Sequence, residues 1–316
     1  MSRSRQLVCL FSLLVCTTVA SAQKATLKWQ LKKGDKFFQT MLTTTEQKMK
    51  VMGTDITQNQ SQKFHFSWEV TAVDGDKVTL KQKIIGVEMN IDIGGSKIEY
   101  KSGDDASKTS PLKGFFDALM QADFEVVFDH SAKGNKITEI KNQQEFIKKL
   151  TDANPQMKGL LEQILSEGSL KEMAGPSFSA VPGKEVAKDE TWDRTVDLDM
   201  GPIGRYKTTY NYKFTGQKDK LATITVTPTL EYTPPKPDVQ KTLPFSIKDA
   251  KLELKKDTAN GTVEFDTEKG RVISAKTKMD ITGELTIEIG GQTTKVTLDQ
   301  KQTTETTTSE KDPTKK

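Results

Sequence analysis

The sequence has almost no cysteine or histidine. Its two cysteines, Cys9 and Cys16, both lie in the first 22 residues, so the rest of the chain can form no disulfide. A chain of 316 residues is long enough to be held together by a hydrophobic core alone. The two histidines, His65 and His130, have no cysteine partner and give neither a zinc site nor an ordinary catalytic triad. We therefore expect a non-enzymatic protein without catalytic residues, metal or cofactor.

Long hydrophobic runs are also missing. The longest run, residues 7–20, is shorter than the roughly 20 residues that a membrane-spanning helix needs. It follows two arginines and leads to the small residues Ala20-Ser21-Ala22, a pattern typical of a secretory signal peptide. We predict a signal peptide over residues 1–22, cleavage near Ala22, and an exported protein that is periplasmic or extracellular.

Two alternatives remain open for this first segment. One is a retained membrane anchor, and the other is a lipid attached to Cys16. A lipidated cysteine usually follows a small residue, whereas Val15 is branched and larger. The sequence therefore favours export followed by removal of the segment.

An excess of one charge is absent as well. The chain has 47 Lys and Arg against 43 Asp and Glu, with both signs mixed along its length. No basic stripe with interleaved aromatic residues is present, so we expect no nucleic-acid partner. Charged residues that alternate along strands indicate solvated faces, which discourage aggregation between sheet edges. Peripheral association with the cell envelope is compatible with this surface.

Period-two alternation of apolar and polar residues dominates the chain. Phe66, Trp68 and Val70, for example, are separated by polar residues, and turn signals such as Gly94-Gly95 lie between such runs. This pattern indicates antiparallel sheets with one wet face, and the long hairpin arms favour curved sheets. We predict a mainly β protein with a few helices, built from antiparallel curved sheets or half-barrels.

The alternating segments occur twice, in the same order. The matched landmarks, first half then second, are Asp35-x-x-Phe38 and Asp189-x-x-Trp192, Phe66-x-Trp68-x-Val70-Thr71 and Tyr210-x-Tyr212-x-Phe214-Thr215, and Val126-x-Phe128-Asp129 and Val263-x-Phe265-Asp266. We predict two tandem β repeats at residues 23–141 and 177–310, followed by a disordered tail at 311–316. Separate domains and one continuous sheet are both compatible with this pattern.

Helical periodicity is confined to the end of the first repeat and the segment between the repeats. An apolar stripe after Pro111 predicts a helix over about 111–122, and a similar stripe after Pro155 belongs to a helical bridge at 142–176. Each stripe needs an apolar partner, and the sheet faces are the only large ones available. We expect these helices to cover the apolar faces in part.

Prolines concentrate in the second repeat between Pro228 and Pro244. Proline lacks the backbone N–H that a central strand needs on both of its sides. We therefore predict a long surface loop that begins at Pro228.

Three further landmarks open the two repeats or lie in their central strands, namely Lys33-Gly34-Asp35-Lys36-Phe37, Trp68-Glu69-Val70-Thr71 and Lys188-Asp189-Glu190-Thr191-Trp192. With these segments the chain resembles a family of secreted bacterial proteins of unknown function with two tandem β-rich repeats. The resemblance covers about residues 27–300 and implies no activity, cofactor or catalytic residue. By fold analogy, half-barrels whose concave face is covered by helices are similar to envelope lipoprotein and lipid carriers.

The aromatic rows are the candidate site. If helices cover them fully they are core, but with incomplete cover they line an apolar concavity. We predict a protein that binds an apolar, lipid-like ligand between curved sheet and helices. The expected contacts are Phe66, Trp68, Tyr210, Tyr212, Met157 and Leu161.

Two other functions remain open. One is a structural or protein-interaction module of the cell envelope whose core is fully packed. The other is a hydrolase, which would require a cleft with two suitably spaced carboxyl groups.

Overall fold

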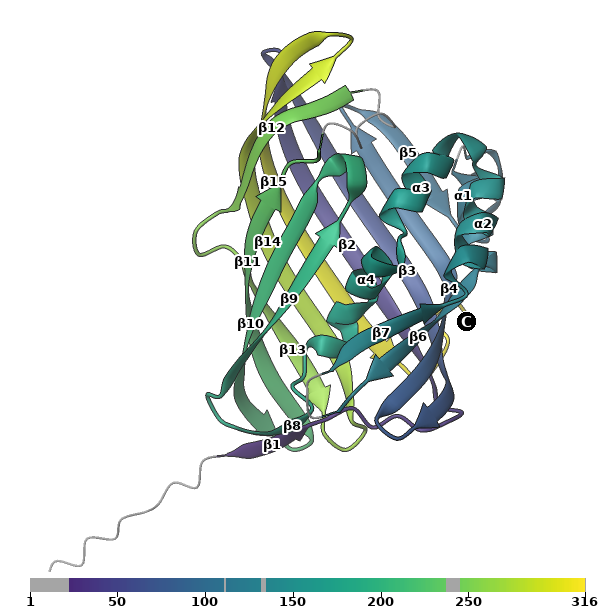
Figure 1. Cartoon of the computed structure of the whole chain (residues 1–316), viewed down its shortest axis with the longest axis vertical. Helices are drawn as coiled ribbons and strands as arrows, with labels where there is room; N and C mark the ends of the chain where they lie inside the picture. Colours follow the sequence, from purple (N-terminus) through teal and green to yellow (C-terminus); the bar gives the residue numbers. More distant parts are fainter. Residues whose placement is uncertain (1–22, 111, 132–134, 237–244, 316) are drawn as a thin grey trace, which may run out of the picture.

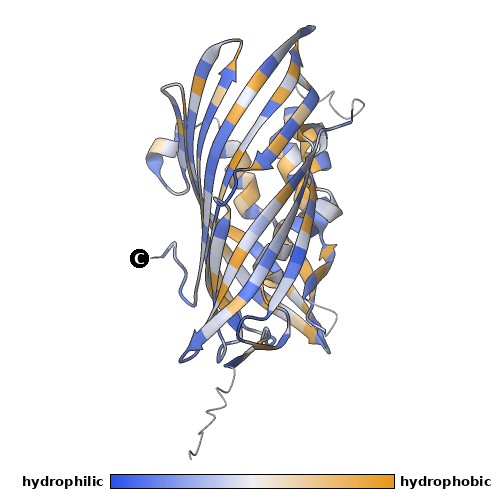
Figure 2. Cartoon of the chain, turned by 90° about the vertical axis from the view of Figure 1, so that its left-hand side faces the viewer, coloured by the Kyte–Doolittle hydropathy of each residue, from blue (hydrophilic) through white to orange (hydrophobic). Residues whose placement is uncertain are grey.

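The protein is mainly β, as predicted. The computed structural model describes residues 23–110, 112–131, 135–236 and 245–315, so the predicted signal peptide lies outside the described residues. A 13-stranded antiparallel sheet curves around helices that pack on one of its faces (Figure 1). Hydrophobic and hydrophilic residues alternate along its strands (Figure 2), as the period-two pattern predicts.

The strands of the sheet come from both halves of the chain. Those of the first half are β2 (Lys36–Val51), β3 (Thr54–Asp74), β4 (Lys77–Ile93), β5 (Ser96–Lys101), β6 (Asp123–Asp129) and β7 (Lys136–Lys141). Those of the second half are β9 (Thr191–Asp199), β10 (Arg205–Lys218), β11 (Leu221–Thr233), β12 (Phe245–Leu254), β13 (Asn260–Asp266), β14 (Arg271–Ile289) and β15 (Gln292–Ser309). A separate two-stranded sheet pairs β1 (Lys24–Leu27) with β8 (Lys184–Ala187).

Strand order follows the internal repeat. Along the sheet it reads β7-β6-β4-β3-β2, then β15, then β14-β13-β11-β10-β9, so strands of both halves join one sheet through β15. The pairing shifts register after Val70 in β3 and after Phe214 in β10, which are matched landmarks. Thr71 Oγ1 donates to the Thr79 carbonyl at 3.3 Å, and Thr215 Oγ1 donates to the Thr223 carbonyl at 3.1 Å. Matched sequence segments thus have matched hydrogen bonds.

One landmark lies a residue away from its expected place. Phe37, not Phe38, lies opposite Trp68 and is only 1% exposed, whereas Phe38 lies opposite Ser67 on the other face. A shift of one residue in a strand moves a side chain to the opposite face. The core aromatic residue that begins the first repeat is therefore Phe37.

A single aromatic cluster joins the two halves. The ring of Trp29, which follows β1, lies 6.3 Å from that of Phe128 in β6 and 6.2 Å from that of Phe265 in β13. The third neighbour is Phe178, whose ring lies 5.2 Å from that of Trp29. Because Phe128 and Phe265 are matched landmarks, the main core lies where the two halves meet.

The helices fall where the apolar stripes predict them. They are α1 (Lys113–Gln121), α2 (Gln143–Ala153), α3 (Lys158–Ile164) and α4 (Glu167–Ser179), with short 3₁₀ helices η1 (Asp105–Thr109), η2 (Pro155–Met157) and η3 (Gly201–Ile203). In the part of the chain that the structure describes, none of these helices is long and apolar enough to cross a membrane.

Helix α4 covers the two end strands of the sheet, β7 and β9. The Glu172 carboxylate accepts a hydrogen bond from the Asp197 amide at 3.2 Å, and Ser169 Oγ donates to the Asp199 carbonyl at 3.0 Å. On the other side, the backbone of Ile140 hydrogen-bonds Glu167. Covering strand edges with a helix removes sites of unwanted strand pairing.

The predicted loop begins later than Pro228. Strand β11 continues to Thr233, and Pro228 pairs with Tyr210 of β10. On its other edge, β11 pairs with β13 only as far as Val226, so the missing N–H of Pro228 interrupts no pairing there. The prediction of a loop from Pro228 was therefore wrong for residues 228–233, and residues 237–244 lie outside the described residues.

Candidate functional site

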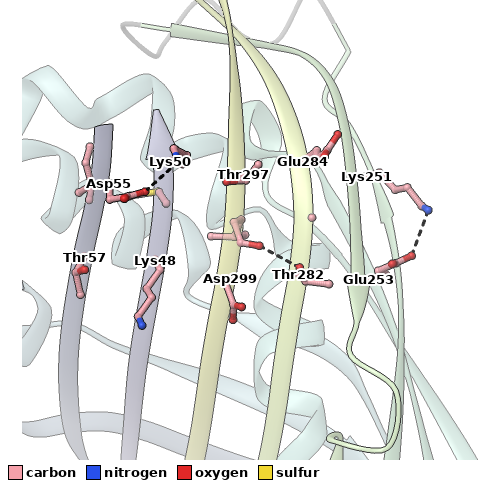
Figure 3. Close-up of a pocket in the computed structure, with 14 residues that line it drawn as sticks. Lys48, Lys50, Asp55, Thr57, Lys251, Glu253, Thr282, Glu284, Thr297 and Asp299 are labelled. Carbon is pink, nitrogen blue, oxygen red and sulfur yellow. Dashed lines mark hydrogen bonds and ion pairs between the residues drawn. The ribbon is translucent and has the colours of Figure 1, made fainter. Parts of the chain in front are cut away.

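Several hollows in the described part of the chain are large enough to hold a ligand, among them one of about 520 Å³ beside Arg205 and Pro234. Two others, one polar and one apolar, lie on opposite faces of the sheet. The first is an open polar groove of about 940 Å³ across β2, β3, β15, β14 and β12 (Figure 3). Lys48 and Lys50 of β2 contribute to it, and strand alternation places them on the face opposite Met41. The helices pack on the Met41 side, so this groove is on the outer face.

Several charged side chains of the groove are held in ion pairs. Lys50 Nζ lies 3.9 Å from a carboxylate oxygen of Asp55, and Lys251 Nζ lies 3.3 Å from one of Glu253. Asp299 is bound by Lys255 at 2.7 Å. Among the described residues, no group of three His, Cys, Asp or Glu side chains could hold a metal ion. We interpret the groove as a solvated strand face.

The second hollow is an apolar cavity of about 390 Å³ between strands β2, β3, β4 and β6 and helices α1 to α4. Its lining residues are Gln39, Met41, Phe64, Phe66, Trp68, Gln82, Ile84, Met89, Phe115, Phe116, Leu119, Phe124, Phe146, Leu150, Leu161, Ile164, Leu165, Leu170, Met173, Ala174 and Thr306. None of these described lining residues is charged or a histidine. The cavity is therefore the candidate functional site.

Strand and helix periodicity together form the cavity. Alternation along β3 turns Phe64, Phe66 and Trp68 to the same face, while α1 supplies Phe115 and Leu119 from its apolar stripe. These residues belong partly to the main core and partly to a smaller cluster around α1 and β4. The cavity lies where the two clusters meet.

The structure brings together half of the expected contacts. Phe66, Trp68 and Leu161 line the cavity, but Met157 does not and is 44% exposed. Met157 belongs to the short helix η2, and the cover begins one turn later at Leu161.

The two tyrosines lie outside the cavity. Tyr212 is 4% exposed and stacks on Trp192 with ring centroids 5.8 Å apart, while Tyr210 lies 6.3 Å from Tyr212. Burial raises the pKa of the Tyr212 phenol. The halves differ here because α1 precedes β6 in the first half, whereas β12 precedes the matching strand β13 in the second. The aromatic row of the second half therefore lacks this helical partner.

Sequence reasoning missed Gln82. It lies directly opposite Trp68 on β4 and faces the cavity between the inward residues Leu80 and Ile84. A polar residue at an inward position of an otherwise apolar row was the available signal. Trp68 Nε1 and Gln82 Oε1 are both buried and have no hydrogen-bond partner among the described residues.

Comparisons with known proteins identify a family without assigning an activity. The sequence profile of DUF6263, a family of unknown function, matches residues 75–312 and confirms the expected resemblance to a family of unknown function. No curated protein matches the chain.

Several solved structures show weak likeness. One is a structure of lipovitellin, solved to show its lipid–protein interactions, which is 13% identical to this chain with a TM-score of 0.40. The match covers 87% of this chain and 25% of the lipovitellin chain. This chain thus spans about a quarter of that protein's length. The outer membrane protein OprG from Pseudomonas aeruginosa is 10% identical, with a TM-score of 0.25 and coverage of 88% and 96%.

Proposed function

The chain belongs to the DUF6263 family of unknown function, and we propose from its cavity that it binds an apolar, lipid-like ligand between sheet and helices. The observation that carries this proposal is a partly open hollow between sheet and helices, whose described lining is aromatic and aliphatic with three polar residues, Gln39, Gln82 and Thr306. Ligand sites are usually concave and mostly apolar, with a few placed polar groups.

The volume supports a single chain as the ligand. Pockets for small ligands span roughly 300–1,000 Å³, so about 390 Å³ lies near the lower end. At roughly 30 Å³ for each water-sized group, this space holds about a dozen such groups. One medium-length acyl or alkyl chain fits that estimate.

Met173 supports an entrance beside α4. It lines the cavity and yet is 54% exposed, so the same side chain contacts both the interior and the solvent. Methionine is flexible and adapts to irregular apolar shapes. We propose that the ligand enters past Met173 and that α3 and α4 form the cover.

The cavity supports binding over catalysis. Its described lining offers no carboxylate, histidine or lysine to act as an acid or base. A core that is fully packed, as a purely structural module would have, does not fit a hollow of this size. Together with the predicted signal peptide, this supports a non-enzymatic carrier that acts after export.

Native mass spectrometry on protein purified gently from its source tests the proposal. We expect extra mass of one lipid-like molecule that disappears on organic extraction. Leu161→Trp places a larger side chain in the cavity and should remove this mass, whereas Met157→Trp, outside the cavity, should keep it. A bare wild-type mass that native lipids do not change, or equal lipid content in both variants, would contradict the proposal.

A further inference from the structure

The three tryptophans of the chain differ in one respect. Trp29 Nε1 donates to the Phe178 carbonyl at 2.9 Å, and Trp192 Nε1 donates to the Ala180 carbonyl at 3.3 Å. Trp68 is only 3% exposed, yet its Nε1 has no hydrogen-bond partner among the described residues. An indole N–H can only donate, so Trp68 requires an acceptor that the described protein does not supply.

A complementary group lies on the next strand. Gln82 is the direct cross-strand neighbour of Trp68, and its Oε1 is a buried acceptor without a donor. Directly opposite residues of antiparallel strands have adjacent side chains. The same cavity wall therefore carries one unused donor and one unused acceptor side by side. Leaving such groups unpaired is unfavourable, because each has lost its hydrogen bond to water.

The rest of the lining restricts the charge of a ligand group that could hydrogen-bond both Trp68 Nε1 and Gln82 Oε1. No charged side chain is among the described lining residues, so an ionised carboxylate or phosphate would be buried without a counter-charge. A carboxylate could accept from Trp68 Nε1 but could not donate to Gln82 Oε1, the atom of that side chain that is buried without a partner. An ether or ester oxygen has the same deficiency.

We propose that Trp68 and Gln82 form a recognition site for an uncharged polar group that both accepts and donates a hydrogen bond, namely a hydroxyl or a protonated carboxyl group. This inference rests on the proposed function and specifies its ligand class as a single-chain lipid with a neutral hydroxyl-bearing head. The group accepts from Trp68 Nε1 and donates to Gln82 Oε1. Its hydrocarbon chain occupies the aromatic and aliphatic remainder of the cavity.

Three probes of equal chain length separate the two hydrogen bonds. Decanol can accept and donate, decyl methyl ether can only accept, and decanoic acid can donate only while it is protonated. For the wild-type protein, isothermal titration should show decanol binding about tenfold more tightly than the ether, the effect of one hydrogen bond. Decanoic acid should bind more weakly as rising pH ionises its carboxyl group.

Two variants assign the bonds to their residues. Gln82→Met keeps the length of the side chain but removes the acceptor, so decanol should lose its advantage while ether binding is kept. Trp68→Phe removes the donor and should weaken decanol and ether alike. Tyr212→Phe alters the matching aromatic position outside the cavity and should change neither affinity.

The outcomes distinguish this inference from the function on which it rests. If decanol and ether bind the wild-type protein equally, or if the decanol advantage survives in Gln82→Met, the inference is overturned while apolar ligand binding stands. If none of the three probes binds, both the inference and the proposed function are overturned.

Discussion

Phe37 and Phe38 are adjacent in the sequence but lie on opposite faces of β2. Phe37 stacks on Trp68 with ring centroids 6.2 Å apart, within the buried core. Phe38 is only half-buried. Because side chains alternate along a strand, the two neighbouring phenylalanines should contribute differently to the stability of the fold.

Replacing each phenylalanine with alanine should show this difference. Phe37→Ala removes a fully buried ring and should lower the free energy of unfolding by about 3–5 kcal/mol. Phe38→Ala should cost much less, because its ring retains contact with water in the folded state. Urea denaturation followed by tryptophan fluorescence measures both values. Equal losses would contradict the assignment of Phe37 to the core.

The sequence could predict which residues alternate, but it could not decide between these two phenylalanines. Asp35 and Asp189 are matched landmarks, yet the strand after Asp35 brings its core aromatic residue one position earlier. Gln82 was missed for a related reason: its inward position is evident from Leu80 and Ile84, but its neighbour Trp68 is set by pairing between strands. Cross-strand register depends on turns and bulges that sequence patterns describe poorly.

Helix α4 shows how a single element can connect distant edges. Its existence was expected from the helical bridge, but its contacts with β7 and β9 depend on how the whole sheet curves. The apolar stripe of α1 likewise predicted a covering helix, and the structure confirms that helix. The first repeat has helix α1 before β6, whereas the second has strand β12 before β13. This difference explains why the aromatic row of the first repeat lines the cavity and that of the second does not.

The two glutamates of α4 should respond to pH in opposite directions. Burial raises the pKa of Glu172, whereas hydrogen bonding to Lys171 lowers the pKa of Glu167. Because the pKa of Glu172 is raised in the folded state, its stabilising effect is fully present at pH values below the unfolded-state pKa of about 4.3. That stabilisation is lost as the pH rises through the folded-state pKa. Because the pKa of Glu167 is lowered in the folded state, its stabilising effect is present at pH values above the unfolded-state pKa and is lost as the pH falls through the folded-state pKa.

Glutamine variants test whether the two glutamates change the stability in opposite directions as the pH rises. Relative to wild type, Glu172→Gln should gain stability as pH rises from 4 to 7, because the variant avoids ionising a buried group. Glu167→Gln should lose relative stability over the same range, because it forgoes an ion pair. Urea midpoints at several pH values provide the measurement. Parallel curves for both variants would refute the opposing assignments.

At the scale of the whole molecule, β15 joins strands of the two halves. It pairs with β14 along one side and with β2 along the other. The duplication was visible in the sequence, but both separate domains and one sheet were compatible with it. Only the pairing of β15 with strands at opposite ends of the chain distinguishes them, and such non-local pairing leaves no local sequence pattern.

A proline in the middle of β15 should disturb this junction. Thr303 pairs with Lys278 on one side and Thr44 on the other, so Thr303→Pro removes a backbone donor from a strand paired on both edges. Calorimetry of the wild type should show one unfolding transition, and the variant should show a lower or divided one. Lys311→Pro, placed after the strand ends at Ser309, is the control. It removes the exposed hydrogen bond from the Lys311 amide to Ser309 Oγ but no strand pairing, so it should change little. A single unchanged transition in Thr303→Pro would contradict the role of β15.

The position of β15 also has a consequence for timing. The partner of β2 on this side begins only at Gln292, and β1 pairs with a strand that begins at Lys184. Until these distant segments pair, the early strands lack part of their native pairing, and folds with such distant contacts form slowly. Closure of the sheet therefore waits for the segment that begins at Gln292, and a chain cut short before that residue leaves the strand edge of β2 open to other proteins.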